Sequence, residues 1–192
     1  MASRSSWSER LRSFAGFLFI VATIALLAWA LSQPSGQAPQ AAFLGKKALN
    51  FEVPLISGSE HLELSSGGKI TLADFAGKPL ILNFWASWCQ SCASETKTME
   101  EFWQAHKDKI AVLGIAVQDS GEAVREFAAA NGKTFPLGLD KSGRASVDYG
   151  VSGVPETFFI DARGIVRHKT SGPVDKKLLQ RMLEQLSSPP SS

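Results

Sequence analysis

Two cysteines separated by two residues are the chain's only cysteines and its first candidates for chemistry. They lie in the run Trp88-Cys89-Gln90-Ser91-Cys92. On a helix this spacing places the second thiol about one turn after the first, close enough to attack a mixed disulfide that the first thiol has formed. The pattern therefore predicts a dithiol that cycles between reduced and oxidised forms, with Cys89 as the nucleophile and Cys92 as the resolving thiol.

Three other roles compete with redox chemistry at this motif. A structural disulfide that closes so small a loop constrains little of the unfolded chain. A structural zinc site needs four ligands, and the three histidines (His61, His106 and His168) are scattered without ligand spacing. Two buried, inert cysteines remain an alternative, although the position of the motif argues against it. No metal ligands and no cofactor beyond the cysteine pair are predicted.

The residues around the motif predict the elements that position it. Residues 79–85 form an almost unbroken apolar run, typical of a central strand buried on both faces. Residues 89–107 then carry apolar side chains at helical spacing. The cysteines therefore lie where a strand gives way to a helix. A thiol at a helix N-terminus faces the positive end of the helix dipole and unpaired amides, which favour its thiolate.

The same predicted helix carries one acidic residue on its apolar face. At 100° per residue, Glu95 lies about 60° from Cys92. It shares that face with the apolar stripe Met99, Phe102, Trp103 and His106. Burial would raise the pKa of Glu95 and make it a candidate proton donor or acceptor for the thiols. The alternative is that Glu95 lies at the edge of the stripe and reaches water.

These residues resemble the TlpA, ResA and CcmG (DsbE) family of thioredoxin-like, extracytoplasmic thiol-disulfide oxidoreductases. The resemblance runs from Phe43 to Gln185, and the CcmG branch is the most similar. The motifs that carry it are Gly77-Lys78-Pro79, Asn83-Phe84-Trp85-Ala86-Ser87-Trp88-Cys89, Glu95 three residues after Cys92, and Gly150-Val-Ser-Gly-Val-Pro-Glu-Thr-Phe-Phe-Ile-Asp161. Ser91 departs from the family, which usually has proline before the second cysteine.

The resemblance implies further site residues. In the thioredoxin superfamily the bond before the corresponding proline is cis, so Val154–Pro155 is expected to be cis and to face Cys89. An extended client segment would then pair with the backbone of Val154. Trp88, Val154, Pro155 and Glu156 are the predicted substrate-binding residues, with Glu156 as a second carboxylate near the thiols. Glu156 as a solvated acid at a strand end is the alternative.

The N-terminal residues predict a membrane anchor. Residues 14–31 are almost wholly apolar and are preceded by Arg4, Arg10 and Arg12 against a single acid, Glu9. A helix of this length just spans a bilayer, and the basic flank favours a cytoplasmic N-terminus. The competing interpretation is a cleaved signal peptide, since Ala28-Trp29-Ala30 fits a cleavage site. The resemblance implies the bacterial cytoplasmic membrane, with the C-terminal domain on the periplasmic side.

The expected organisation is a cytoplasmic flank (1–13), a transmembrane helix (14–31), a flexible linker (32–42), a thioredoxin-like domain (43–187) and a disordered tail (188–192). The three basic residues and one acid of the flank account for the whole net charge of +2. The remaining chain is neutral, which gives no basic field for nucleic acid.

The fold class predicted for the domain is an α/β, thioredoxin-like sandwich with an N-terminal extension and an extra strand and helix in its middle. An edge strand is expected at 49–56, because Pro54 lacks an N–H. A buried strand is expected at 110–117, a helix at 121–131, a short helix at 140–149, a hairpin of strands 157–160 and 165–169, and a closing helix at 175–186.

The function implied by the resemblance is that of an extracytoplasmic reductant. Its client would be the oxidised haem-attachment cysteines of apocytochrome c or a haem-ligation assembly protein. A membrane thiol transporter of the DsbD or CcdA type would supply electrons. Two alternatives remain: a general TlpA-like reductase with another client, and a non-enzymatic adaptor that binds an extended peptide.

Overall fold

The computed structural model describes residues 5–32, 43–58 and 68–187. The chain divides into two units, Met1–Pro39 and Gln40–Ser192, which are described separately. Most of the predicted linker, residues 59–67 and the predicted disordered tail lie outside the described residues.

The first unit contains a single described helix, α1 (Ser5–Ser32), which includes the predicted anchor. The described large apolar side chains of α1 are exposed, from Phe14 to Trp29. In the part of the chain that the structure describes, no helix is found that is both long and apolar enough to cross a membrane. A membrane-spanning role for residues 14–31 therefore stays a prediction.

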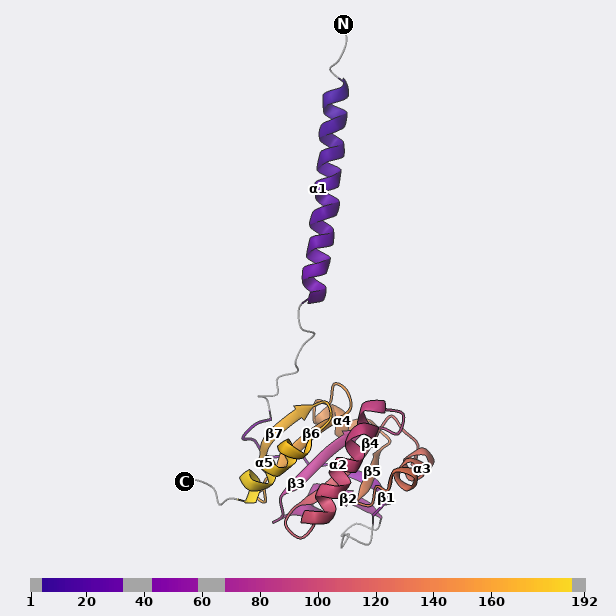
Figure 1. The fold of residues 1–192 in the computed structure, drawn as a ribbon, viewed down its shortest axis with the longest axis vertical. Helices are drawn as coiled ribbons and strands as arrows, with labels where there is room; N and C mark the ends of the chain where they lie inside the picture. Colours follow the sequence, from indigo (N-terminus) through magenta and orange to yellow (C-terminus); the bar gives the residue numbers. More distant parts are fainter. Residues whose placement is uncertain (1–4, 33–42, 59–67, 188–192) are drawn as a thin grey trace. The chain divides into compact units, whose positions relative to one another are not determined.

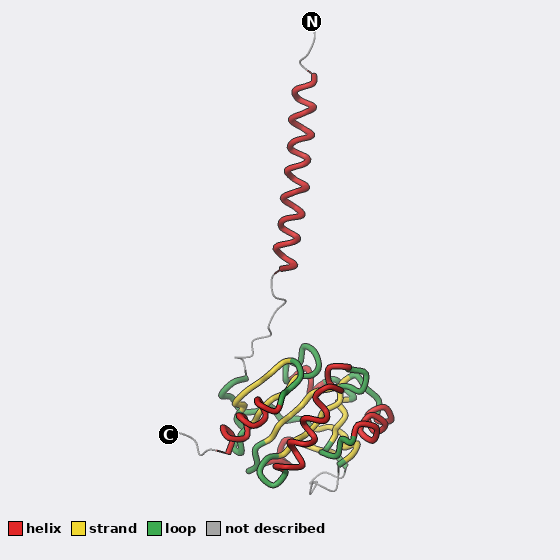
Figure 2. Tube along the Cα trace, viewed as in Figure 1, coloured by secondary structure: helices red, strands yellow, loops and turns green. Residues whose placement is uncertain are grey.

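The second unit is built on a mixed sheet with helices on both faces (Figure 1 and Figure 2). Its strands lie in the order β2-β1-β5-β4-β3-β6-β7. They are β1 (Glu52–Ser57), β2 (Lys69–Thr71), β3 (Leu80–Trp85), β4 (Ala111–Val117), β5 (Leu137–Asp140), β6 (Glu156–Ile160) and β7 (Val166–Ser171). The helices are η3 (Leu72–Phe75), α2 (Gln90–His106), α3 (Gly121–Asn131), α4 (Arg144–Asp148) and α5 (Lys176–Ser187).

Strand β3 lies at the centre of this arrangement, as its apolar run predicts. It pairs in parallel with β4 and antiparallel with β6, and all its residues are buried. Because side chains alternate along a strand, Ile81 and Trp85 enter one core, and the even-numbered residues enter the other. The end of β3 thus delivers the chain directly to the cysteines.

Two cores flank the sheet. The first lies under α2, α3 and α5 and contains both cysteines together with Trp85, Met99 and Trp103. The second lies on the opposite face, where rings of Phe43, Phe51, Phe84, Tyr149 and Phe158 pack with centroids 5.0–6.3 Å apart. Phe84 belongs to this second core, so β3 is anchored on both sides just before the active-site turn.

The prediction that β1 is an edge strand is wrong. Strand β1 lies between β2 and β5, and the edges of the sheet are β2 and β7. The predicted obstacle, Pro54, pairs with Lys69 of β2, whereas pairing with β5 begins at Leu55. The missing N–H of Pro54 therefore does not interrupt the ladder to β5.

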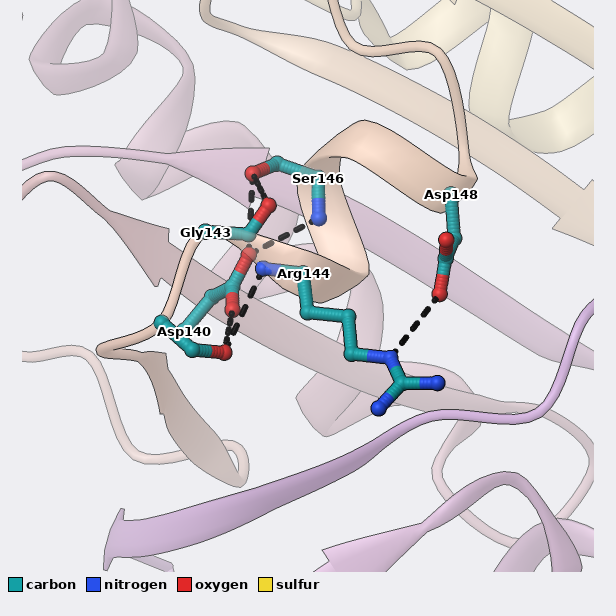
Figure 3. A network of polar contacts seen from close by, with 6 residues as sticks. Asp140, Gly143, Arg144, Ser146 and Asp148 are labelled. Atoms are coloured by element: carbon teal, nitrogen blue, oxygen red, sulfur yellow. Dashed lines mark hydrogen bonds and ion pairs between the residues drawn. The ribbon is translucent and has the colours of Figure 1, made fainter.

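The prediction of a helix over 140–149 is too long at its start, because Asp140 ends strand β5. Asp140 is buried, and its carboxylate accepts hydrogen bonds from the Ser146 amide at 2.8 Å and the Ser146 hydroxyl at 2.9 Å (Figure 3). Lys141 and Ser142 form the turn between them, Gly143 is the N-cap residue, and α4 begins only at Arg144. Asp140 thus joins the end of β5 to the short helix that follows it.

Candidate active site

The two cysteines form a disulfide at the start of α2. Cys89 is the N-cap residue, and the Cys92 amide donates to Cys89 Sγ at 3.1 Å. Cys92 is 1% exposed and Cys89 6% exposed, so the second sulfur is the deeper of the two. In the reduced protein the same amide, together with the helix dipole, would favour a Cys89 thiolate. This placement agrees with the predicted strand-to-helix position of the motif.

The residue that departs from the family pattern contacts the first cysteine. Ser91 Oγ lies 3.3 Å from Cys89 Sγ. Proline at this position would have no donor to offer. A hydroxyl at this distance can donate to a Cys89 thiolate and adds to the stabilisation from the Cys92 amide.

A cis peptide bond joins Val154 and Pro155, as the resemblance implies. The Val154 carbonyl oxygen lies 3.6 Å from Cys89 Sγ. Val154 is partly buried and packs against both cores. The backbone at Val154 is therefore held beside the sulfur that is expected to meet a client.

The exposed tryptophan of the motif is held by a loop that follows β4. Trp88 is 60% exposed, and its Nε1 donates to the Gln118 carbonyl at 3.1 Å. Gln118 has φ of 50°, a strained left-handed conformation for a residue with a side chain. Next to it, Asp119 accepts from the Ser87 amide at 2.6 Å. The loop at Gln118 and Asp119 thus holds both Ser87 and Trp88 of the active-site turn, and the exposed Trp88 ring remains available to contact a client.

Glu95 is buried on α2, three residues after Cys92, which excludes the alternative that it reaches water. It is 3% exposed. Asn83 Nδ2 donates to one carboxylate oxygen at 2.9 Å, and the Val174 amide donates to the other at 2.8 Å. Desolvation raises the pKa of Glu95; these two hydrogen bonds and the charge of Lys133 oppose that rise in part. A carboxyl group with a raised pKa suits proton transfer.

Glu156 is not brought together with the thiols. Its register partner on β3 is Phe84, so it lies on the sheet face opposite Asn83 and Glu95. Its carboxylate accepts from Ser152 at 3.0 Å and pairs with buried Lys169 at 2.9 Å. These contacts do not support the predicted role of a substrate-binding carboxylate near the thiols. Glu156 instead ties the loop before Pro155 to β7.

Sequence reasoning missed two parts of this site. Lys133 follows the glycine that ends α3 and resembles a solvated loop residue, yet it is 6% exposed and lies over the Trp85 ring. The Gln118–Asp119 loop likewise gives no local signal that it contacts Trp88. Both contacts join segments that are distant in sequence. Among the described residues, no cluster of histidine, cysteine and acidic side chains is suited to hold a metal ion.

Comparison with known proteins supports the chemistry that this geometry suggests. The AhpC/TSA family model matches residues 44–169. A thiol:disulfide interchange protein DsbE from Xylella fastidiosa is 33% identical over 88% of this chain and 82% of its own length. A thiol-disulfide oxidoreductase ResA from Bacillus cereus is 32% identical over 75% of this chain and 79% of its own length.

Solved structures agree. A crystal structure of a thiol:disulfide interchange protein of the thioredoxin family from Chlorobium tepidum is similar at a TM-score of 0.63 and 26% identity, covering 74% of this chain and 96% of that one. The chain therefore belongs to the AhpC/TSA family and is a thiol-disulfide oxidoreductase of the DsbE and ResA type with a thioredoxin-like fold.

Proposed function

We propose that this oxidoreductase acts as an extracytoplasmic reductant in cytochrome c biogenesis. The client is the oxidised haem-attachment site of apocytochrome c, or a haem-ligation protein that carries it. The observation that carries the exchange chemistry is the cysteine pair at the start of α2, facing the cis Val154–Pro155 backbone. The choice of client is supported by the resemblance of residues 150–161 to the CcmG branch and by the relatives named DsbE.

The proposed reaction moves two electrons from the dithiol to the client disulfide, and the protons lost by Cys89 and Cys92 are balanced, through Glu95 and water, by those that the two client sulfurs take up. The Cys89 thiolate attacks one client sulfur, forms a mixed disulfide and releases the other client sulfur, which takes up a proton. Cys92 then loses its proton to Glu95 and attacks Cys89 Sγ. The Cys89–Cys92 disulfide forms, and the second client sulfur leaves and is protonated. A membrane thiol transporter of the DsbD or CcdA type restores the dithiol.

Replacement of Cys92 with alanine is expected to trap the client. Cys89 can still attack, but no second thiol remains to release the mixed disulfide, so the adduct accumulates. Isolation of the variant from cells without reductant, followed by mass spectrometry of what reductant releases, identifies the client. We expect peptides of apocytochrome c or of a haem-ligation protein.

The matched control is the Cys89→Ala, Cys92→Ala double variant, which contains no nucleophile and should release nothing. Adducts with unrelated proteins only would replace the cytochrome client with that of a general reductase. A folded Cys92→Ala protein without any reducible adduct would favour a peptide-binding adaptor.

We also propose that the N-terminal segment anchors the protein in the bacterial cytoplasmic membrane and that the second unit lies on the periplasmic side. The support is the uncharged run at 14–31, its arginine-rich flank and the exposed apolar side chains of α1. The full-length protein is expected to stay with membranes after a high-salt wash and to be digested by protease added to spheroplasts. A soluble product that begins near Leu31 would instead show a cleaved signal peptide.

A further inference from the structure

The core beneath the disulfide contains a buried lysine that the mechanism above does not use. Lys133 lies in the loop between α3 and β5. Its ammonium nitrogen is 3.4 Å from the centroid of the Trp85 ring and 5.2 Å from that of Phe135. Trp85 is fully buried at the end of β3, four residues before Cys89. Lys133 is thus packed between aromatic rings at the base of the active-site turn.

The ammonium group is not neutralised by a close partner. Within the described ranges, no carboxylate lies within ion-pair distance of Lys133. The charged groups that act on it both come from α2, namely Glu95 and Glu100. The other neighbours, Trp85 and Phe127, present rings. Burial of a cation without a paired anion costs stability, and an apolar side chain would avoid that cost.

Of the two carboxylates, Glu95 lies in the core, whereas Glu100 lies near the surface. Glu100 is partly exposed and accepts from the Thr134 amide at 2.9 Å, which fixes the loop that carries Lys133 to α2. Glu95 is buried and takes its hydrogen bonds from Asn83 and Val174. Asn83, which contacts Glu95, and Trp85, which contacts Lys133, are two residues apart on β3 and therefore lie on the same face of the sheet. The positive charge of Lys133 thus acts on the buried carboxyl group three residues after the resolving thiol.

We propose that Lys133 is a positioning residue that sets the protonation state of Glu95 and thereby the pH dependence of the step in which Cys92 resolves the mixed disulfide. With the ammonium present, Glu95 more readily holds its charge and accepts the Cys92 proton. Without it, Glu95 keeps its own proton, and Cys92 stays a thiol. The inference rests on exchange by Cys89 and Cys92 and does not depend on which client is reduced.

The pKa shifts of Lys133 and Glu95 agree with this arrangement. Burial lowers the pKa of Lys133 to about 7, and the two carboxylates oppose that shift. The charge of Lys133 in turn works against the desolvation that raises the pKa of Glu95. Two groups that interact in this way titrate as a coupled pair, so the protonation state of one changes the pKa of the other.

Lys133→Met is the direct test, because methionine is only one atom shorter than lysine and still packs against the aromatic rings but removes the charge. A peptide that contains a C-x-x-C-H disulfide serves as the oxidant of the reduced full-length protein, and stopped-flow tryptophan fluorescence follows resolution from pH 4 to pH 9. We expect the pH midpoint of the resolution rate to move upward by about one unit, the scale of a nearby opposite charge. Lys109→Met removes an exposed charge and should leave the midpoint unchanged.

The same substitution in a Glu95→Gln background separates an electrostatic role from a structural one. If Lys133 acts through Glu95, Lys133→Met does not change the pH profile of Glu95→Gln any further. An unchanged midpoint in the folded single variant, or a change of the pH profile by Lys133→Met in the Glu95→Gln background, would overturn the proposal. A failure of exchange itself would appear in the unmodified protein and in all variants alike.

A second measurement needs no substitution. Carbon-13 NMR of the reduced, unmodified protein follows the Glu95 carboxyl and the Lys133 side chain through a pH titration. Coupling predicts that each signal shows a step at the midpoint of the other. Two independent single steps would contradict the proposal, even if Lys133→Met did not fold.

Lys133→Met is expected to be more stable than the parent at acidic pH, although its resolution step should require a higher pH. Because the folded protein binds the Lys133 proton less tightly than the unfolded chain, this group destabilises the parent below pH 7. That penalty disappears as pH rises from about 7 towards the ordinary lysine value of 10.5. The Tm of Lys133→Met should therefore exceed that of the parent at pH 6 and approach it near pH 10.

Discussion

Replacement of Cys89 with serine is expected to abolish disulfide exchange. Cys89 is the N-cap residue of α2 and is the sulfur beside the Cys92 amide, Ser91 and the Val154 carbonyl. A serine hydroxyl at this position is not ionised near neutral pH and does not attack a disulfide. The rate of client reduction should fall by on the order of 10³-fold or more, to that of the buffer alone, as happens when a catalytic nucleophile is removed.

Cys92→Ser is the matched control for this result. It leaves the Cys89 thiolate in place, so the first half of the reaction should continue at close to the parent rate and stop at the mixed disulfide. The burst of released client thiol, measured in a single turnover, distinguishes the two variants. A burst in Cys89→Ser and none in Cys92→Ser would exchange the roles of the two cysteines.

Glu95→Gln is expected to have the second largest effect, about 10²-fold on the resolution rate above the pKa of Glu95. This is the scale on which removal of a positioned base acts. In the parent the rate should rise with pH as Glu95 loses its proton, at a pH above the ordinary glutamate value of 4.5 because burial raises its pKa. Glutamine keeps the shape and the hydrogen bond to Asn83 or Val174 but accepts no proton, so this rise should disappear.

The stability of the same variant provides an independent check. The folded protein holds the Glu95 proton more tightly than the unfolded chain does. The contribution of Glu95 to stability is therefore present below pH 4.5 and is lost as pH rises through its folded pKa. Thermal unfolding of Glu95→Gln should lack this loss. A variant with the parent's rate profile and the parent's pH-dependent Tm would show that Glu95 does not titrate in the folded protein.

Local patterns were enough to predict the elements that carry the cysteines. The apolar run that became β3 is buried on both faces, and the helix predicted at 121–131 is α3, ended by Gly132 at φ of 63°. The apolar face predicted for α2 is buried at Met99, Phe102 and Trp103. In each case the information lies within one element, because periodicity reports which side of that element is buried.

The errors arose where contacts between distant segments decide the structure. Strand β5 has only four residues, and one of them is Gly138. A Cβ at Gly138 would lie 2.5 Å from the side chain of Val53, so glycine is needed where β1 pairs with β5. Nothing near residue 138 in the sequence indicates that neighbour, so the presence of Pro54 alone decided the edge placement of the strand.

The residues of the active site also fall into two groups, those that a local motif predicts and those whose position depends on distant contacts. The cysteines, Glu95 and the proline at 155 could be predicted from spacing and resemblance, since each belongs to a local motif. The contacts of Glu156 and Lys133 could not. The face of Glu156 depends on its register with Phe84, and the burial of Lys133 depends on packing against Trp85. A charged residue in a short segment gives the same local signal in the core and at the surface.

The central claim is that Cys89 is the accessible, acidic thiol and Cys92 the buried, resolving one. It is tested most directly by alkylation of the reduced full-length protein across a range of pH, with mass spectrometry to identify which cysteine is labelled. We predict that Cys89 is labelled first, with an apparent pKa below the value of about 8.5 for a free cysteine. Preferential labelling of Cys92, or equal labelling of both with an ordinary thiol pKa, would contradict the account.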